Sequence, residues 1–161
     1  MPAVARLSRS LALTAEELDE LLATSWNMRL ATQGPGHRIN VTPLWFVWVG
    51  GRIYTFCRGQ KVVNLRRNPH ATVLVDRNER FPELQGAMLQ GTATILDDAQ
   101  AEAADAHLSE ARALMGRKYN GGYGRPPQTD PPPFPGTATG STWRWVVFVP
   151  INVVTWDNTK L

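Results

Sequence analysis

The chain has 161 residues, of which 43% are hydrophobic, so it is long enough to bury the core of one compact domain. Its 17 basic and 14 acidic side chains give a formal net charge of +3, which is too small to demand a nucleic-acid partner. A single cysteine, Cys57, excludes an intramolecular disulfide framework and is typical of a reducing cytosol.

The N-terminus lacks the apolar core of a secretory signal before its acidic residues begin. No run approaches the ~20 apolar residues of a membrane span. We therefore expect a cytoplasmic protein without membrane contacts, folded as a single domain over 1–161.

The segment LTAEELDELLA predicts the first helix, over about 14–24. Thr14 can cap this helix, and Glu17 lies three residues further on, where it closes a capping box. The leucines of the segment form one apolar stripe, which indicates a short amphipathic helix that lies against a sheet.

Alternation of polar and apolar residues then predicts three strands joined by tight turns. Pro43 lies within the second and cannot donate to a ladder, so we expect a bulge there or a strand whose N–H side is free. The series indicates an antiparallel meander. The strands cover Asn27–Gln33, His37–Val49 and, after Gly50–Gly51, Arg52–Arg58.

The next segment, KVVNLRRNP, predicts one or two helical turns that end at Pro69. HATVLVD and AMLQGTATILDD are the fourth and fifth strands, with a bulge or bend at Gly91. Asp97 or Asp98 caps a second helix, AQAEAADAHLSEARALMGRKY. The last strand, TWRWVVFVPINVVTWD, has a break near Pro150.

Between the second helix and the last strand, Asn120–Ser141 is too rich in glycine and proline for regular structure. Two interpretations stay open for it, a lid over a substrate or a disordered surface loop. The remaining pattern predicts a mainly β (α+β) fold, a barrel of six or seven antiparallel strands with peripheral helices, because closure removes exposed sheet edges.

Signatures of catalysis by side chains are missing from the sequence. His37, His70 and His107 are isolated, so they form no metal-ligand pattern. Cys57 is expected to be an inert, semi-buried thiol. If the protein is an enzyme, a cofactor therefore supplies the reactive atom.

A basic cluster follows the third strand. Arg58 and Lys61 flank a strand-to-helix turn at Gly59, where cations and free backbone N–H groups make an anion site, and Asn64 can add a donor. A solvated helix face explains the same pattern equally well. The following pair, Arg66–Arg67, is expected to stay in solvent, one of them paired with an acidic neighbour.

The stretch RLATQGPGHRINVTPLWFVWVGGRIYTFCRGQKVVNLRRNPHATVLVD, with LQGTATIL after it, resembles the pyridoxamine 5'-phosphate oxidase-like split β-barrel family. Within that family it is most similar to the flavin and deazaflavin oxidoreductases, which use FMN or coenzyme F420. The resemblance covers about Trp26 to Leu96 and the final strand.

The resemblance implies a split-barrel homodimer with two cofactor sites at the subunit interface. It places the cofactor phosphate at Arg58, Gly59, Gln60, Lys61 and Asn64. It places the tricyclic ring against Thr42, Pro43, Trp45 and Thr55, with Met88 and Gln90 reaching in from the partner subunit.

The implied activity is hydride transfer between bound F420 and a small organic acceptor of unspecified identity. FMN is the alternative cofactor, and Arg66, Arg67, Arg77 and Arg80 are equally consistent with an F420 tail site or with ordinary surface charge. A non-catalytic flavin- or haem-binding protein of the same fold is the alternative function. Nucleic-acid binding is not expected, because the net charge is low and no recognition helix is present.

Overall fold

The structure is a computed structural model that describes residues 10–161. The predicted absence of a secretory signal concerns a segment that lies largely outside the described residues. The elements within them are α2 (Ala15–Thr24), β1 (Met28–Gln33), η1 (Pro35–His37), β2 (Ile39–Leu44), β3 (Val47–Val49), β4 (Arg52–Cys57), α3 (Gln60–Arg67), β5 (His70–Arg77), η2 (Phe81–Glu83), β6 (Gln85–Leu96), α4 (Ala99–Ala104), α5 (Leu108–Lys118), β7 (Arg144–Asp157) and η3 (Asn158–Lys160).

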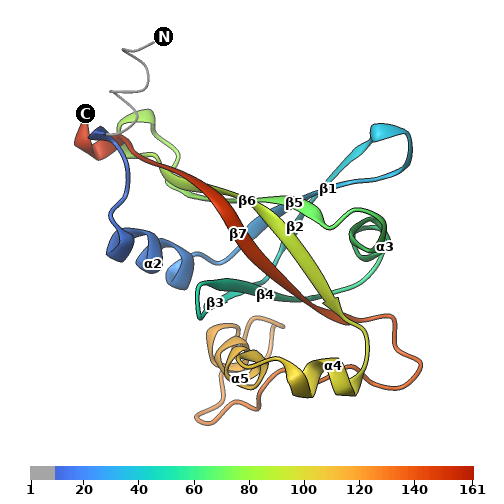
Figure 1. Cartoon of the computed structure of the whole chain (residues 1–161). Coiled ribbons are helices and arrows are strands. Elements are labelled where there is room, and N and C mark those ends of the chain that lie inside the picture. Colours follow the sequence, from blue (N-terminus) through green and yellow to red (C-terminus); the bar gives the residue numbers. More distant parts are fainter. Residues whose placement is uncertain (1–9) are drawn as a thin grey trace.

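The strands of residues 10–161 form one antiparallel seven-stranded sheet in the order β2-β1-β5-β6-β7-β4-β3, curled into a half-barrel (Figure 1). The long strands β6 and β7 cross the middle of the molecule. The helices α4 and α5 lie together beyond β3 and β4. The helices α2 and α3 lie at opposite ends of the curled sheet in this view, and both add side chains to one core. The fold class predicted from the sequence is confirmed. No helix in residues 10–161 is long and apolar enough to cross a membrane.

The first helix forms as predicted, because its N-terminus satisfies its own backbone groups. Thr14 Oγ1 accepts a hydrogen bond from Glu17 N at 3.2 Å, and Glu17 Oε2 accepts one from Thr14 N at 2.7 Å. Leu21 and Leu22 are fully buried where the helix packs on the sheet. Local sequence and tertiary packing therefore agree at α2.

The single strand predicted over His37–Val49 is wrong, and so is the meander. The segment forms two strands, β2 and β3, that lie at opposite edges of the sheet, and Trp45–Phe46 crosses between them. The crossing backbone is satisfied by a side chain, since Tyr119 Oη accepts from Phe46 N at 2.9 Å and donates to Phe46 O at 3.0 Å. Pro43 does lie in an edge strand, as predicted for a residue without an N–H.

The bulge predicted at Gly91 is confirmed, because the register of β6 and β7 shifts between Gln90 and Gly91. A Cβ atom at Gly91 would lie 2.0 Å from Val149 O, so only glycine fits there. Pro150 stands opposite Gly91 in the same bulge, and β7 continues through it instead of breaking.

The second helix is capped by Asp98, whose carboxylate accepts from Ala101 N at 2.8 Å. The predicted single helix is divided into α4 and α5 around Asp105, which accepts hydrogen bonds from Tyr54 Oη at 2.8 Å and from His107 N at 3.0 Å. Because a side chain of β4 binds the junction, the helical pattern of the sequence did not reveal the break.

Candidate functional site

The predicted phosphate corner is a tight turn between β4 and α3. Gly59 has a φ of 89°, a conformation that favours glycine, and it opens the helix at Gln60. Lys61 Nζ donates to Arg58 O at 2.7 Å, so the ammonium folds back over the turn. The exposed guanidinium of Arg58 lies 5.1 Å from the Trp143 ring. Two cations and the open end of a helix therefore meet at one place.

Asn64 differs from these neighbours, because it is only 1% exposed. Its Nδ2 donates to Thr32 Oγ1 at 3.1 Å, and its Oδ1 accepts from Gln60 Nε2 at 2.8 Å. The bond to Thr32 attaches α3 to β1, and the bond from Gln60 lies within α3. The groups of the corner that remain to face an anion are therefore the cations of Arg58 and Lys61 and the backbone at Gly59.

Arg66 and Arg67 are both exposed, as predicted for surface charge. Arg66 pairs with Asp97, and this hydrogen bond holds the pKa of the Asp97 carboxyl below its usual value. Arg67 is exposed. The prediction that one of the two pairs with an acidic neighbour is confirmed.

The residues predicted to face the cofactor ring come from β2, the crossing segment and β4. Thr55 is 2% exposed and donates to Trp45 O at 2.7 Å, which ties β4 to the crossing segment. Thr42 Oγ1 and Asn40 Oδ1 are buried without any hydrogen-bond partner in the described residues. Buried polar atoms without partners are costly, so a hydrogen-bond donor brought to β2 by a ligand would be stabilising there. Asn40 was not among the residues predicted to face the ring, although it shares a strand face with Thr42.

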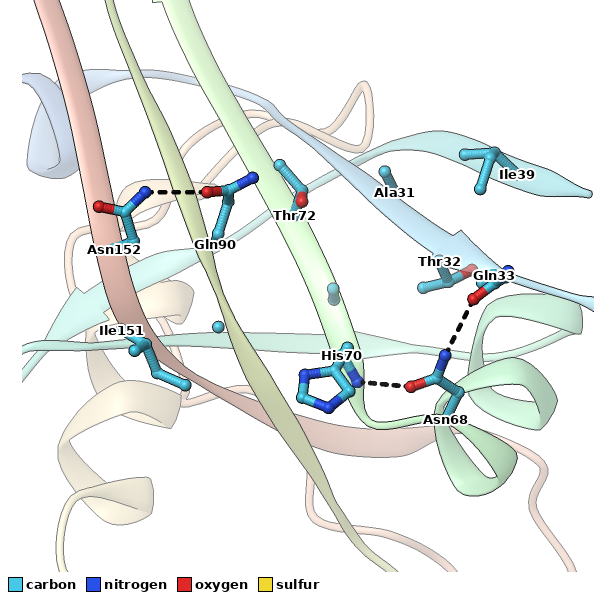
Figure 2. Close-up of a pocket in the computed structure, with 12 residues that line it drawn as sticks. Ala31, Thr32, Gln33, Ile39, Asn68, His70, Thr72, Gln90, Ile151 and Asn152 are labelled. Atoms are coloured by element: carbon cyan, nitrogen blue, oxygen red, sulfur yellow. Dashed lines mark hydrogen bonds between the residues drawn. The ribbon is translucent and has the colours of Figure 1, made fainter. Parts of the chain in front are cut away.

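Gln90 does not join this group within one chain. It lies on the outer face of β6, where its Oε1 accepts from Asn152 Nδ2 at 2.9 Å (Figure 2). Together with His70, Ile39 and Ile151 it lines a separate cleft of about 470 Å³. Its predicted role requires a second subunit and stays a prediction, as does that of Met88.

A larger cleft, about 920 Å³, lies between the crossing segment, α5 and residues 120–143. At its base the Trp45 and Tyr119 rings are stacked, with centroids 4.3 Å apart and planes 6° apart. Phe56 and Trp143 stack at 5.3 Å in its wall. The residues of this cleft are so far apart in the chain that they give no local pattern, and the sequence alone did not predict the cleft.

The described residues contain no metal centre, since no three potential ligands come together in 10–161. Cys57 is 1% exposed, and burial raises its pKa to about 11. The thiol is therefore protonated at neutral pH and is a poor nucleophile, as the sequence predicted.

A family model described as pyridoxamine 5'-phosphate oxidase matches residues 14–138 of the chain. No curated protein matches the sequence. A conserved hypothetical protein from Mycobacterium tuberculosis is similar in structure, with 22% identity and a TM-score of 0.72 over 94% of this chain and 89% of that one.

Two further solved structures are similar to this chain. An FAD-binding protein from Mesorhizobium loti has 19% identity and a TM-score of 0.65 over 89% of this chain and 94% of its own. A protein described as an F420 reductase has 21% identity and a TM-score of 0.55 over 84% of this chain and 94% of its own. At these identities the similarity shows a shared fold.

Proposed function

The chain belongs to the pyridoxamine 5'-phosphate oxidase family, and from this premise we propose that it is an oxidoreductase that uses a bound flavin or deazaflavin. The reaction is hydride transfer between the cofactor and a small organic acceptor. F420 is the cofactor we favour, and FMN is the alternative.

The observation that carries this proposal is the pair of orphaned polar atoms on β2. Thr42 Oγ1 and Asn40 Oδ1 are buried without partners, and Thr42 is one of the residues expected to face the ring. A ring system with hydrogen-bonding edges would satisfy both atoms. The cations of Arg58 and Lys61 match the other part of such a molecule, its phosphate. The residues present therefore fit the group.

The chain itself would bind and orient, since the bound cofactor supplies the hydride chemistry. Arg58, Gly59 and Lys61 would hold the phosphate, while Pro43 and Trp45 would pack against the ring. No acid–base pair is needed to deliver a hydride. This agrees with the protonated thiol of Cys57.

The proposal includes a homodimer that shares the cofactor sites. Exposed apolar side chains gather on the outer face of β2 and β7, in and around the smaller cleft, which is unusual for a free surface. A second copy of the chain would cover them and would bring its Gln90 towards the cofactor. These exposed side chains are Ile39, Val41, Val149, Ile151 and Val154.

The choice between cofactors is tested by titrating the purified chain with FMN and with F420 and following absorbance and fluorescence. F420 is expected to bind more tightly, one molecule per chain, because its acidic tail can reach free surface arginines such as Arg67 and Arg80. Tighter binding of FMN would mean that FMN, the alternative, is the cofactor. Failure of both to bind would contradict the proposed function.

A non-catalytic binding protein is the second candidate. Among the three histidines, His70 lines a cleft, the one on the outer sheet face, where an imidazole could ligate a haem iron (Figure 2). Haem titration of wild-type protein and His70→Ala separates this candidate from the flavin proposal, because only a haem role predicts an absorption shift that the substitution removes.

A further inference from the structure

The proline-rich segment after α5 is fastened to the body of the protein at both ends. We call residues 126–135 the proline-rich strap. Near its start, Asn120 Nδ2 donates to Gln128 O at 2.7 Å and Gln128 N donates to Asn120 Oδ1 at 3.0 Å. Near its end, Phe134 N donates to Arg112 O at 2.9 Å and Arg112 Nε donates to Phe134 O at 2.6 Å.

The strap also packs closely on α5. A Cβ atom at Gly116 would lie 2.2 Å from Pro132 O, so the helix presents a bare backbone where the strap crosses it. Trp145 Nε1 donates to Pro135 O at 2.9 Å from the buried side of β7. Of the two interpretations that the sequence left open, these contacts favour neither a disordered loop nor a freely swinging lid. The strap is a fixed wall of the larger cleft.

The inner surface of this cleft is aromatic. Trp45 is stacked on Tyr119, and the Tyr123 ring meets Trp45 edge-on, with centroids 4.9 Å apart and planes at 69°. Phe134 stands 6.4 Å from Trp45 and 6.4 Å from Tyr123, so these three rings form one contacting cluster that lines the cleft. Rings at such distances and angles offer both faces and edges to another aromatic ring.

The charge of the lining is as informative as its apolar character. Arg125 is the one charged residue among the described residues that line the cleft, and no carboxylate lines it. A bound cation would gain cation–π contacts with the rings but no ion pair, and Arg125 would repel it, whereas a singly negative molecule gains an ion pair with Arg125.

We propose that this aromatic cleft is a binding site for a flat, fused-ring aromatic molecule that is neutral or carries one negative charge. The ligand lies in the cleft against the cluster of Trp45, Tyr123 and Phe134, with an anionic group directed to Arg125. Pro43 and Trp45 line this cleft and are also the residues assigned to the cofactor ring. The ligand is therefore the hydride acceptor, and this assignment of its role rests on the proposed function. The binding itself does not.

Calorimetric titration of the cofactor-free chain tests the site directly. The probes are 2-naphthol, naphthalene-2-sulfonate, 2-naphthylmethylammonium and the saturated decahydro-2-naphthol. The expected result is one molecule of naphthol or sulfonate per chain, with the ammonium and the saturated alcohol about tenfold weaker or more. Equal affinity for all four probes, or no saturable binding, would overturn the proposal.

Variants locate the binding within the molecule. Tyr123→Ala is expected to weaken naphthol binding about tenfold, whereas Phe81→Ala, a ring of equal exposure (68% for both) outside the cleft, is expected to leave it unchanged. Arg125→Gln should reduce only the affinity for the sulfonate. Gly116→Val, which pushes on the strap, should weaken both ligands, with circular dichroism confirming that the chain is folded.

Two results would contradict the placement of the ligand: unchanged affinity in Tyr123→Ala and Gly116→Val together, or an equal loss in Phe81→Ala. Because all titrations use cofactor-free protein, they remain informative if FMN and F420 fail to bind. Naphthol binding without cofactor binding would contradict the proposed function and support the aromatic site. Cofactor binding without naphthol binding would contradict the aromatic site alone.

Discussion

The double variant Arg58→Ala, Lys61→Ala is expected to lose about a thousandfold in affinity for whichever cofactor the wild type binds. A hydrogen bond to a charged group contributes roughly 1.5–3 kcal/mol, and the two cations are assigned to the same phosphate. Each single variant should lose about tenfold to a hundredfold. Fluorescence titration of the cofactor gives all three values, and thermal unfolding checks that the variants fold.

The matched control is Arg67→Ala, Arg80→Ala, which removes the same charge from two exposed positions outside the turn. With FMN, which has no acidic tail, this control should bind like the wild type. Equal losses in the two double variants would mean that the corner acts only through net charge. Undiminished binding in the first double variant would remove the phosphate assignment altogether.

Ile151→Asp is expected to convert the proposed homodimer into monomers. Ile151 is 75% exposed on the apolar outer face, so a carboxylate there costs little in the free chain. Burying the same carboxylate between two subunits without a partner costs several kcal/mol, in both copies at once. Analytical ultracentrifugation over a range of concentrations measures the change.

Leu161→Asp serves as the control for this substitution, because it places the same charge at a side chain that is 70% exposed at the end of the chain. It should leave the dimer intact. If Ile151→Asp remains a dimer, the subunits associate through another face. If the wild type is itself a monomer, the proposal of shared cofactor sites is wrong.

Local features of the fold could be predicted where residues close together in the sequence determine the backbone conformation. The capping box of Thr14 and Glu17 and the bulge at Gly91 are examples, because each depends on residues close to it in the chain or on the special freedom of glycine. The crossing at Trp45–Phe46 was not predictable. Its apolar alternation continues without interruption, and the group that satisfies the turn is Tyr119, 73 residues away.

The candidate site likewise has parts that could be predicted from the sequence and parts that could not. The corner at Arg58, Gly59 and Lys61 is contiguous in the sequence, so its convergence could be predicted. The sequence could not show that Asn64 is not part of this corner, because only the fold shows that Thr32 lies close enough to accept a hydrogen bond from its amide. The aromatic cleft could not be predicted, since its walls come from segments far apart in the chain.

The central claim is that this chain accelerates hydride transfer from a bound cofactor. Its most direct test is stopped-flow mixing, without oxygen, of the reduced cofactor–protein complex with 1,4-naphthoquinone, a flat neutral acceptor suited to the aromatic cleft. Cofactor absorbance is expected to recover at least about a hundredfold faster in the complex than it does for free reduced cofactor. Tight binding with reoxidation no faster than that of free cofactor would contradict it and would identify the protein as a carrier.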